Sequence, residues 1–140
     1  MEKDYFCKRA DGSYMKGKVW PGECYFPGYT NPEVRIWWAD LFKGLIADNG
    51  LAGILNDMNE PAVMDVPNKT FPDDVCHDYD GHPCSHRKAH SIYEAQMARA
   101  TYEGVKKFIY PKRPFVITRS AYSGTQRYKS SWFGDNVATW

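Results

Sequence analysis

Two acidic side chains, Asp57 and Glu60, follow a short apolar segment and could perform acid–base or nucleophilic chemistry. The segment, residues 51–55, is bounded by turn residues, which predicts a buried β-strand. Both acids would then lie at the carboxyl end of the strand, where α/β barrels place their catalytic residues. A buried carboxylate is unfavourable unless it is paired or hydrogen-bonded, so two at one strand end favour a functional site. The alternative is an acidic turn that caps a helix.

A second apolar segment near the C-terminus also ends in polar residues. Residues 114–118 predict a strand that runs into Arg119. After a loop, Trp132 and its neighbours lead to Asp135. Asp57 and Asp135 are thus about two βα repeats apart. Two carboxyl groups on separate βα units suit glycoside hydrolysis, in which one is nucleophile or base and the other is proton donor.

The residues between these two strands predict a crossover helix. Apolar and small residues recur at helical spacing over residues 88–107, and Tyr110-Pro111 ends the pattern. A strand, a helix of this length and a second strand indicate a βαβ unit with a parallel sheet. Small residues such as Gly104 are expected to let the helix pack closely on the sheet.

The N-terminal part predicts turns, a short hairpin and one helix. Residues 1–29 contain Asp-Gly and Pro-Gly turns, with a hairpin expected around residues 14–20. Asn31-Pro32 is typical of a helix start, and Asn49-Gly50 of a helix end. Between them one apolar stripe at helical spacing comprises Val34, Trp37, Trp38, Leu41, Phe42, Leu45 and Ile46. The two tryptophans on this stripe are expected in the core.

Residues 61–85 predict a long loop, which is uncommon unless it is functional or disordered. It carries Cys76, His77, His82 and Cys84, which could bind zinc in a small metal-stabilised interaction domain. The spacing is irregular and no paired C-x₂-C pattern is present, so no metal is expected. The four cysteines of the chain permit disulfides, including one between Cys76 and Cys84, without indicating them.

Four ordered blocks of the chain resemble glycoside hydrolase family 31. Residues 56–61, with the sequence NDMNEP, resemble the nucleophile signature of that family. Residues 118–120, 124–128 and 132–136, the last of which end in GDN, resemble its acid/base region, and residues 90–93 and 97–104 resemble the connecting helix. Residues 19–22 followed by 26–32 resemble a further block of the family. Any block alone is weak, but four in order over nearly the whole chain are specific.

The resemblance implies a retaining α-glucosidase-type glycoside hydrolase that needs no cofactor. Asp57 would attack the anomeric carbon, and Asp135 would protonate the leaving oxygen and then deprotonate water. Asp57 must stay ionised, for which Arg119 is the candidate partner. Asp135 must hold a proton near neutral pH, so apolar neighbours such as Trp132 must raise its pKa.

The resemblance also implies the residues that contact the substrate, an α-glucoside or oligosaccharide. These residues are Trp20, Met58, Arg119 and Trp132. The sequence departs from the family at Leu55, where a tryptophan that shapes the sugar pocket is usual. Linkage preference is therefore left open.

A complete (β/α)₈ barrel takes about 250 residues, which exceeds the 140 residues of this chain. We therefore expect residues 1–140 to form a single fragment of a catalytic barrel. Its fold class is α/β: a partial TIM barrel that contains only the middle strands, parallel and flanked by helices. The remainder of the parent barrel would be its partner, and the fragment is expected to be inactive alone.

Composition narrows the function further. The net charge is +1 and no basic stripe is present, so nucleic acid is not an expected partner. No apolar run suits a membrane span and no signal-peptide pattern begins the chain, which leaves the compartment open. Five Trp and ten Tyr suit a sugar cleft or a heavy core. The alternative function is a non-catalytic carbohydrate-binding module, which predicts an exposed aromatic platform and no close carboxylate pair.

Overall fold

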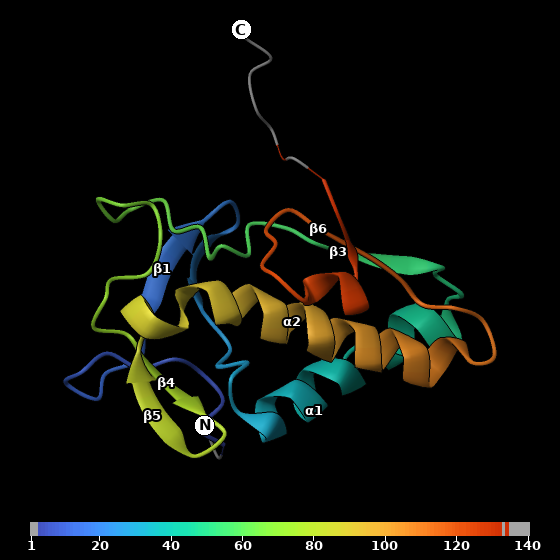
Figure 1. Cartoon of the computed structure of the whole chain (residues 1–140), viewed down its shortest axis with the longest axis horizontal. Helices are drawn as coiled ribbons and strands as arrows, with labels where there is room; N and C mark the ends of the chain where they lie inside the picture. The colour runs from blue at the N-terminus through green and yellow to red at the C-terminus, as the bar shows by residue number, and fades with distance from the viewer. Residues whose placement is uncertain (1–2, 133, 135–140) are drawn as a thin grey trace, which may run out of the picture.

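The fold is organised around a small parallel sheet and one long helix. A computed structural model describes residues 3–132 and 134. The strands β3 (Gly53–Asn56), β6 (Phe115–Thr118) and β7 (Ser130–Ser131) are parallel and lie in the order β3-β6-β7. Helix α2 (His86–Ile109) connects the first two strands and runs through the centre of the molecule (Figure 1). The predicted βαβ unit is confirmed.

Helix α1 (Pro32–Asp40) packs against α2, below it in Figure 1. A side chain at Gly104 would come within 2.7 Å of the Ala39 carbonyl oxygen, so glycine lets the two helices approach closely. The prediction that Gly104 packs on the sheet was wrong, because this face of α2 meets α1.

The predicted helix start is confirmed, and Asn49-Gly50 ends the helical stretch as predicted, but the stretch is not one continuous helix. The Asn31 side chain accepts a hydrogen bond from the Glu33 backbone N–H at 2.8 Å. Instead, α1 ends at Asp40, and a separate π-helical turn, η1 (Gly44–Asp48), follows. Gly44 is the first residue of η1, and glycine is unfavourable inside a helix, which is consistent with a break at this point. Leu41 and Leu45, expected on the buried stripe, are exposed as a result.

Two antiparallel hairpins flank these elements. The first, β1 (Lys16–Val19) with β2 (Gly22–Tyr25), lies further along the chain than predicted. The second, β4 (Cys76–Tyr79) with β5 (His82–Ser85), occupies the end of the predicted loop, so that prediction was wrong. Its turn residues Asp80 and Gly81 have φ values of 49° and 84°, which is the left-handed pattern of a type I′ hairpin turn.

The core consists of two hydrophobic clusters that α2 joins. The larger cluster lies towards the hairpins and contains Cys7, Met15, Phe26, Tyr29, Val34, Val63, Phe71, Val75, Tyr93 and Ala100. The smaller cluster lies towards the sheet and contains Phe42, Ile46, Val105 and Val116. Trp37 and Trp38 pack against the larger cluster, so the prediction that they are core residues is confirmed.

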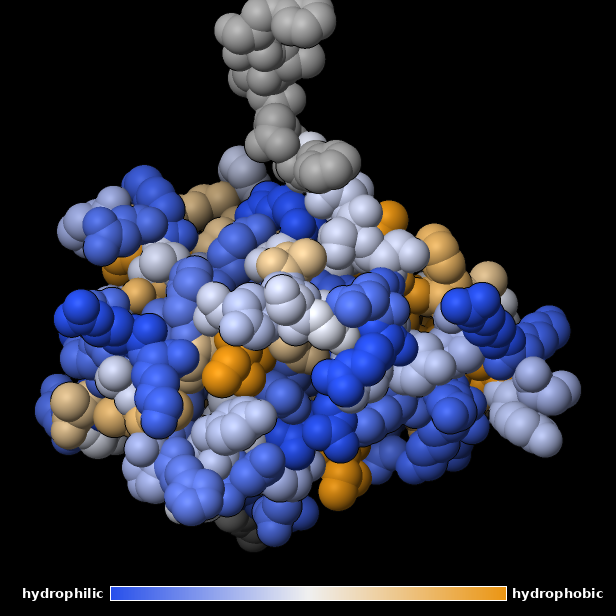
Figure 2. Space-filling model, in the orientation of Figure 1, coloured by the Kyte–Doolittle hydropathy of each residue, from blue (hydrophilic) through white to orange (hydrophobic). Residues whose placement is uncertain are grey.

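One face of the molecule is mainly hydrophilic, with small hydrophobic patches between the charged side chains (Figure 2). Large apolar side chains are nevertheless exposed on the strands of the parallel sheet. Leu55 in β3 is 54% exposed and Phe115 in β6 is 56% exposed. These neighbouring strands therefore present apolar surface that further protein could cover.

Three histidines form a row inside the second hairpin and the start of α2. His77 Nε2 lies 3.0 Å from His86 Nδ1, and His86 Nε2 lies 2.9 Å from His90 Nδ1. His77 and His86 are buried against the ring of Phe71. Burial lowers the pKa of His77 to about 4 and that of His86 to about 3. His77 and His86 are therefore neutral at physiological pH.

The Cys and His residues considered above as possible zinc ligands do not converge in the described part of the chain. No group of three or more His, Cys, Asp or Glu there is placed to hold a metal ion. The four cysteines Cys7, Cys24, Cys76 and Cys84 are free thiols. Within residues 3–132 and 134, no helix is long and apolar enough to cross a membrane.

Acidification should destabilise the protein through the histidine row. Unfolded histidines take up protons below a pKa of about 6.5 while His77 and His86 remain neutral, so the free energy of unfolding falls as pH drops towards 4. We expect a loss of about 2–4 kcal/mol between pH 7.5 and 5. Thermal unfolding at both pH values checks this, with the exposed His82 replaced (His82→Gln) as control. His86→Gln should remove roughly half of the pH dependence; an unchanged dependence would contradict the assignment.

Candidate active site

Asp57 directly follows β3, at the carboxyl end of the parallel sheet. Its side chain is 48% exposed, so the carboxylate keeps contact with solvent. Oδ1 also accepts a hydrogen bond from the Met58 backbone N–H at 2.9 Å. Met58 has φ 54°, a left-handed conformation that is rare for a residue with a side chain. Such conformations cluster at functional sites, where the surrounding structure enforces them.

Arg119, which directly follows β6, lies beside both predicted acids. Its Nε and Nη2 donate to Glu60 Oε1 at 2.9 Å and Oε2 at 2.8 Å, a two-pronged arrangement that fixes the guanidinium plane. The same Nε lies 3.7 Å from Asp57 Oδ1. Burial of Glu60 works to raise its pKa, but the hydrogen bonds and charge of Arg119 outweigh it and the pKa is lowered. Both carboxylates thus face one fixed positive charge.

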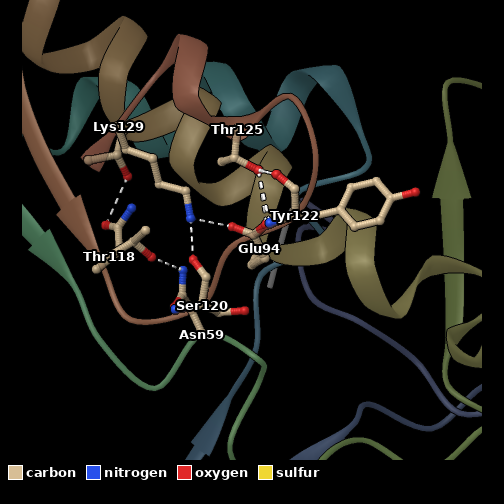
Figure 3. A network of polar contacts seen from close by, with 9 residues as sticks. Asn59, Glu94, Thr118, Ser120, Tyr122, Thr125 and Lys129 are labelled. Carbon is tan, nitrogen blue, oxygen red and sulfur yellow. Dashed lines mark hydrogen bonds and ion pairs between the residues drawn. The ribbon is translucent and has the colours of Figure 1, made fainter. Parts of the chain in front are cut away.

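The buried side chain of Asn59 joins the Asp57 turn to the end of β6 (Figure 3). Its Nδ2 donates to Thr118 Oγ1 at 2.7 Å, and its Oδ1 accepts from the Ser120 backbone N–H at 3.2 Å. These two contacts lie on either side of Arg119 in the chain. Asn59 therefore fixes the backbone that carries the guanidinium.

A second set of hydrogen bonds supports the end of β3 from the helices. Thr101 of α2 donates through Oγ1 to Asn56 Oδ1 at 3.2 Å. The Trp38 indole N–H of α1 donates in turn to Thr101 Oγ1 at 3.0 Å. Asn56 directly precedes Asp57, so both helices help to set the position of the acidic turn.

A cavity of about 370 Å³ opens beside Asp57. Trp20, Met58 and Pro61 line it together with Asp57, and Tyr93 and Met97 of α2 form part of its wall. Trp20 lies in the turn of the first hairpin and is 81% exposed. The cavity thus combines a carboxylate with apolar and aromatic surface, as ligand-binding clefts commonly do.

The structure brings several of the predicted site residues together. Asp57, Met58 and Trp20 line one cavity, and Arg119 is an ion-pair partner of Asp57 without lining it. Trp132 lies beyond β7, where its backbone N–H donates to the Thr118 carbonyl at 3.2 Å, and it does not line this cavity. Asp135 lies outside the described residues.

The supporting roles of Glu60 and Asn59 were not predicted from the sequence. Glu60 was noted as a strand-end acid, but its role as the principal partner of Arg119 depends on the pairing of β3 with β6. Asn59 stands within the same motif, and only its burial distinguishes it from an exposed turn residue. A buried amide needs hydrogen-bond partners, which is the physical reason for its two contacts.

The geometry suits nucleophilic chemistry at Asp57. A carboxylate that lies 3.7 Å from a guanidinium nitrogen, open to solvent and beside an apolar cavity, can attack an electrophilic carbon bound there. Glu60 is less suited, because Arg119 occupies both of its oxygens.

Comparison with known proteins finds that this chain is similar to glycosyl hydrolases of family 31. A family model for the glycosyl hydrolases family 31 TIM-barrel domain matches residues 1–140. Alpha-glucosidase 2 of Bacillus thermoamyloliquefaciens is 47% identical over 137 residues, which cover 98% of this chain and 17% of the relative. Human neutral alpha-glucosidase AB is 38% identical over 96% of this chain and 14% of the relative. The chain therefore spans less than a fifth of the length of these curated relatives.

Two solved glucosidase structures also resemble this chain. A crystal structure of the glucosidase II alpha subunit, in its alpha3-Glc2-bound form, matches with a TM-score of 0.85 and 36% identity. The match covers 98% of this chain and 15% of that one. A family 31 alpha-glucosidase from Bacteroides thetaiotaomicron matches with a TM-score of 0.74 and 42% identity, over 97% of this chain and 21% of that one.

Replacing Asn59 should test the hydrogen bonds that flank Arg119. Asn59→Ala leaves the buried Thr118 hydroxyl and the Ser120 N–H without their partner, which should cost about 1–3 kcal/mol in the free energy of unfolding. Denaturant unfolding measures this. The exposed Asn68 provides the control, because Asn68→Ala should change stability by less than about 0.5 kcal/mol. Equal effects of the two substitutions would show that the Asn59 contacts contribute nothing.

Proposed function

The chain belongs to glycoside hydrolase family 31, and we propose that it carries the catalytic centre of a retaining α-glucosidase. Asp57 is the nucleophile and Asp135 the acid/base residue in this proposal. One observation carries it: Asp57 ends a parallel strand, lies beside an aromatic cavity and pairs with Arg119 at 3.7 Å.

The strand order supports the assignment of Asp135. β3, β6 and β7 are parallel, so their carboxyl ends meet at one edge of the sheet. Asp57 follows β3 at that edge, and the chain leaves β7 at the same edge shortly before Asp135. Double displacement requires the two carboxyl groups to lie about 5–5.5 Å apart, and in this proposal they are those of Asp57 and Asp135.

The mechanism assigns different physical requirements to the two acids. Asp57 attacks the anomeric carbon while Asp135 protonates the departing oxygen, which forms a covalent glycosyl-enzyme. Asp135 then removes a proton from water, and the water displaces Asp57 with net retention. The guanidinium of Arg119 stabilises the ionised Asp57 before attack and again when the ester breaks.

The substrate contacts follow from the cavity and the family. The exposed indole of Trp20 can cover the apolar face of a terminal glucose, and Met58 lies on the cavity wall beside Asp57. We propose that Arg119 contacts a sugar hydroxyl as well as Asp57, and that Trp132 contributes wall from the β7 side. Leu55 is exposed on β3, so the aromatic surface usual at this position is replaced by an aliphatic one.

We propose that residues 1–140 act as one piece of a longer catalytic chain, as the middle strands of a (β/α)₈ barrel. The apolar side chains exposed on β3 and β6 support this, because the inward face of a barrel is normally filled with such residues. The remaining strands would complete the α-glucoside pocket. Activity measurements therefore belong to the full-length protein that contains this sequence.

The nucleophile can be identified chemically. Asp57→Asn should lower kcat/KM for an aryl α-glucoside by at least roughly a thousandfold. A fluorinated glucosyl fluoride, which slows hydrolysis of the intermediate, should add a glycosyl mass to the peptide that contains Asp57. Asp73→Asn, an exposed acid away from the cavity, is the control and should keep wild-type kinetics. Sugar binding without any hydrolysis would favour the carbohydrate-binding alternative.

The acid/base residue should be recognised by its dependence on the leaving group. Asp135→Asn should slow hydrolysis of maltose-type substrates by roughly 10²–10⁴-fold, since their alcohol leaving groups need a proton. Substrates with an acidic phenol as leaving group should be far less affected in the glycosylation step. Added azide should restore turnover as a glucosyl azide. Equal losses with both kinds of substrate would reject this role for Asp135.

A further inference from the structure

A buried ion pair between Glu94 and Lys129 lies behind the candidate active site (Figure 3). Lys129 Nζ lies 2.5 Å from Glu94 Oε2, and the two side chains are 0% and 2% exposed. Glu94 comes from the middle of α2, and Lys129 directly precedes β7. A pair this well buried is unusual, because lysine and glutamate are rarely excluded from solvent.

Each member of the pair also holds the loop that connects β6 with β7. Lys129 Nζ donates to the Ser120 carbonyl oxygen at the start of that loop. Thr125 Oγ1 lies 3.1 Å from Glu94 Oε1 and 2.5 Å from the Tyr122 carbonyl oxygen, and its one proton can be donated to either of these acceptors. One ion pair thus fixes the start, middle and end of the loop to α2.

The loop is continuous with the site at both of its ends. Ser120 directly follows Arg119, and its backbone N–H donates to the Asn59 side chain beside Asp57. At the other end, Lys129 leads into β7 and the segment towards Asp135. A displacement of Ser120 or Lys129 would therefore reach Arg119 on one side and β7 on the other.

Stability alone does not account for such a pair. Burial raises the pKa of Glu94 and lowers that of Lys129, and the ion pair works against both shifts. Well-packed apolar side chains of similar size are often as stabilising as a buried ion pair. What apolar side chains cannot supply is the directed contact with the Ser120 carbonyl and the Thr125 hydroxyl.

We propose that Glu94 and Lys129 are positioning residues, which hold the β6–β7 loop so that Arg119 and β7 keep their places at the active site. The inference rests on the proposed hydrolase function for its kinetic consequence. Neither residue touches the cavity that contains Asp57, so both act through the loop.

The test is a paired substitution in the full-length protein, Glu94→Leu with Lys129→Met. It removes both charges, and we expect Tm to stay within a few degrees of wild type. We expect kcat for an aryl α-glucoside to fall roughly 10- to 100-fold, because a small displacement of catalytic groups has effects of that size. KM should change less than about threefold, since the cavity walls are untouched. The control removes an outward-facing ion pair of the same helix, Arg99→Met with Glu103→Leu, and should leave all three values unchanged.

Hydrogen–deuterium exchange supplies a readout that does not depend on activity. Residues 120–128 should exchange faster in the double variant than in the control, while peptides of β1 and β2 should not. If the double variant does not fold, Thr125→Val removes only the hydroxyl that contacts Glu94 and should show a smaller change of the same kind.

Two outcomes separate this inference from the proposed function. Wild-type kcat and unchanged exchange in a folded double variant would overturn the positioning role and leave the hydrolase proposal intact. A wild-type protein that hydrolyses no α-glucoside would overturn the hydrolase proposal and the kinetic part of the inference. An additional Arg119→Lys background refines the result: if the pair acts through Arg119, the two losses should combine to less than their product.

Discussion

The parallel pairing of β3 with β6 is the constraint on which the rest of the site depends. A register of Asn56 with Thr118 places the residues that follow, Asp57 and Arg119, side by side at the same edge. Parallel strands require a long crossover, and α2 provides it while contributing Thr101 and Glu94 to the supporting contacts. A shift of the register by one residue would turn the side chains of β3 to the opposite face and separate the acid from its partner.

Around this edge, charge is distributed so that Arg119 serves two carboxylates unequally. Glu60 takes the two short hydrogen bonds and keeps the guanidinium fixed, whereas Asp57 lies at 3.7 Å and remains open to solvent. A group that must form a bond cannot have all its oxygens committed to hydrogen bonds. Glu60 therefore acts as the fixed counter-charge, and the nucleophile role that we propose for Asp57 is compatible with its looser contact.

The sequence predicted those features that depend on local patterns. Hydrophobic period and turn residues identified β3, α2 and β6, and the strand-end acids predicted the edge at which the candidate site lies. The hairpin β4–β5 was missed because Pro83 argued against a strand, although Asp80-Gly81 is a strong hairpin signal. The end of α1 was missed because the apolar stripe continues in sequence past the point where the helix stops.

Other contacts depend on tertiary structure and left weaker signals. Glu94 falls on the same stripe of α2 as the buried Ala98, Thr101 and Val105, and an acid on such a stripe requires a buried partner. The sequence does not indicate that this partner is Lys129, which arrives only because the β6–β7 loop folds back over α2. The buried charges of Glu94 and Lys129 also differ from the exposed charge of Asp57. Glu94 and Lys129 can be buried because each neutralises the charge of the other, whereas the Asp57 side chain lies 3.7 Å from Arg119 and remains 48% exposed to solvent.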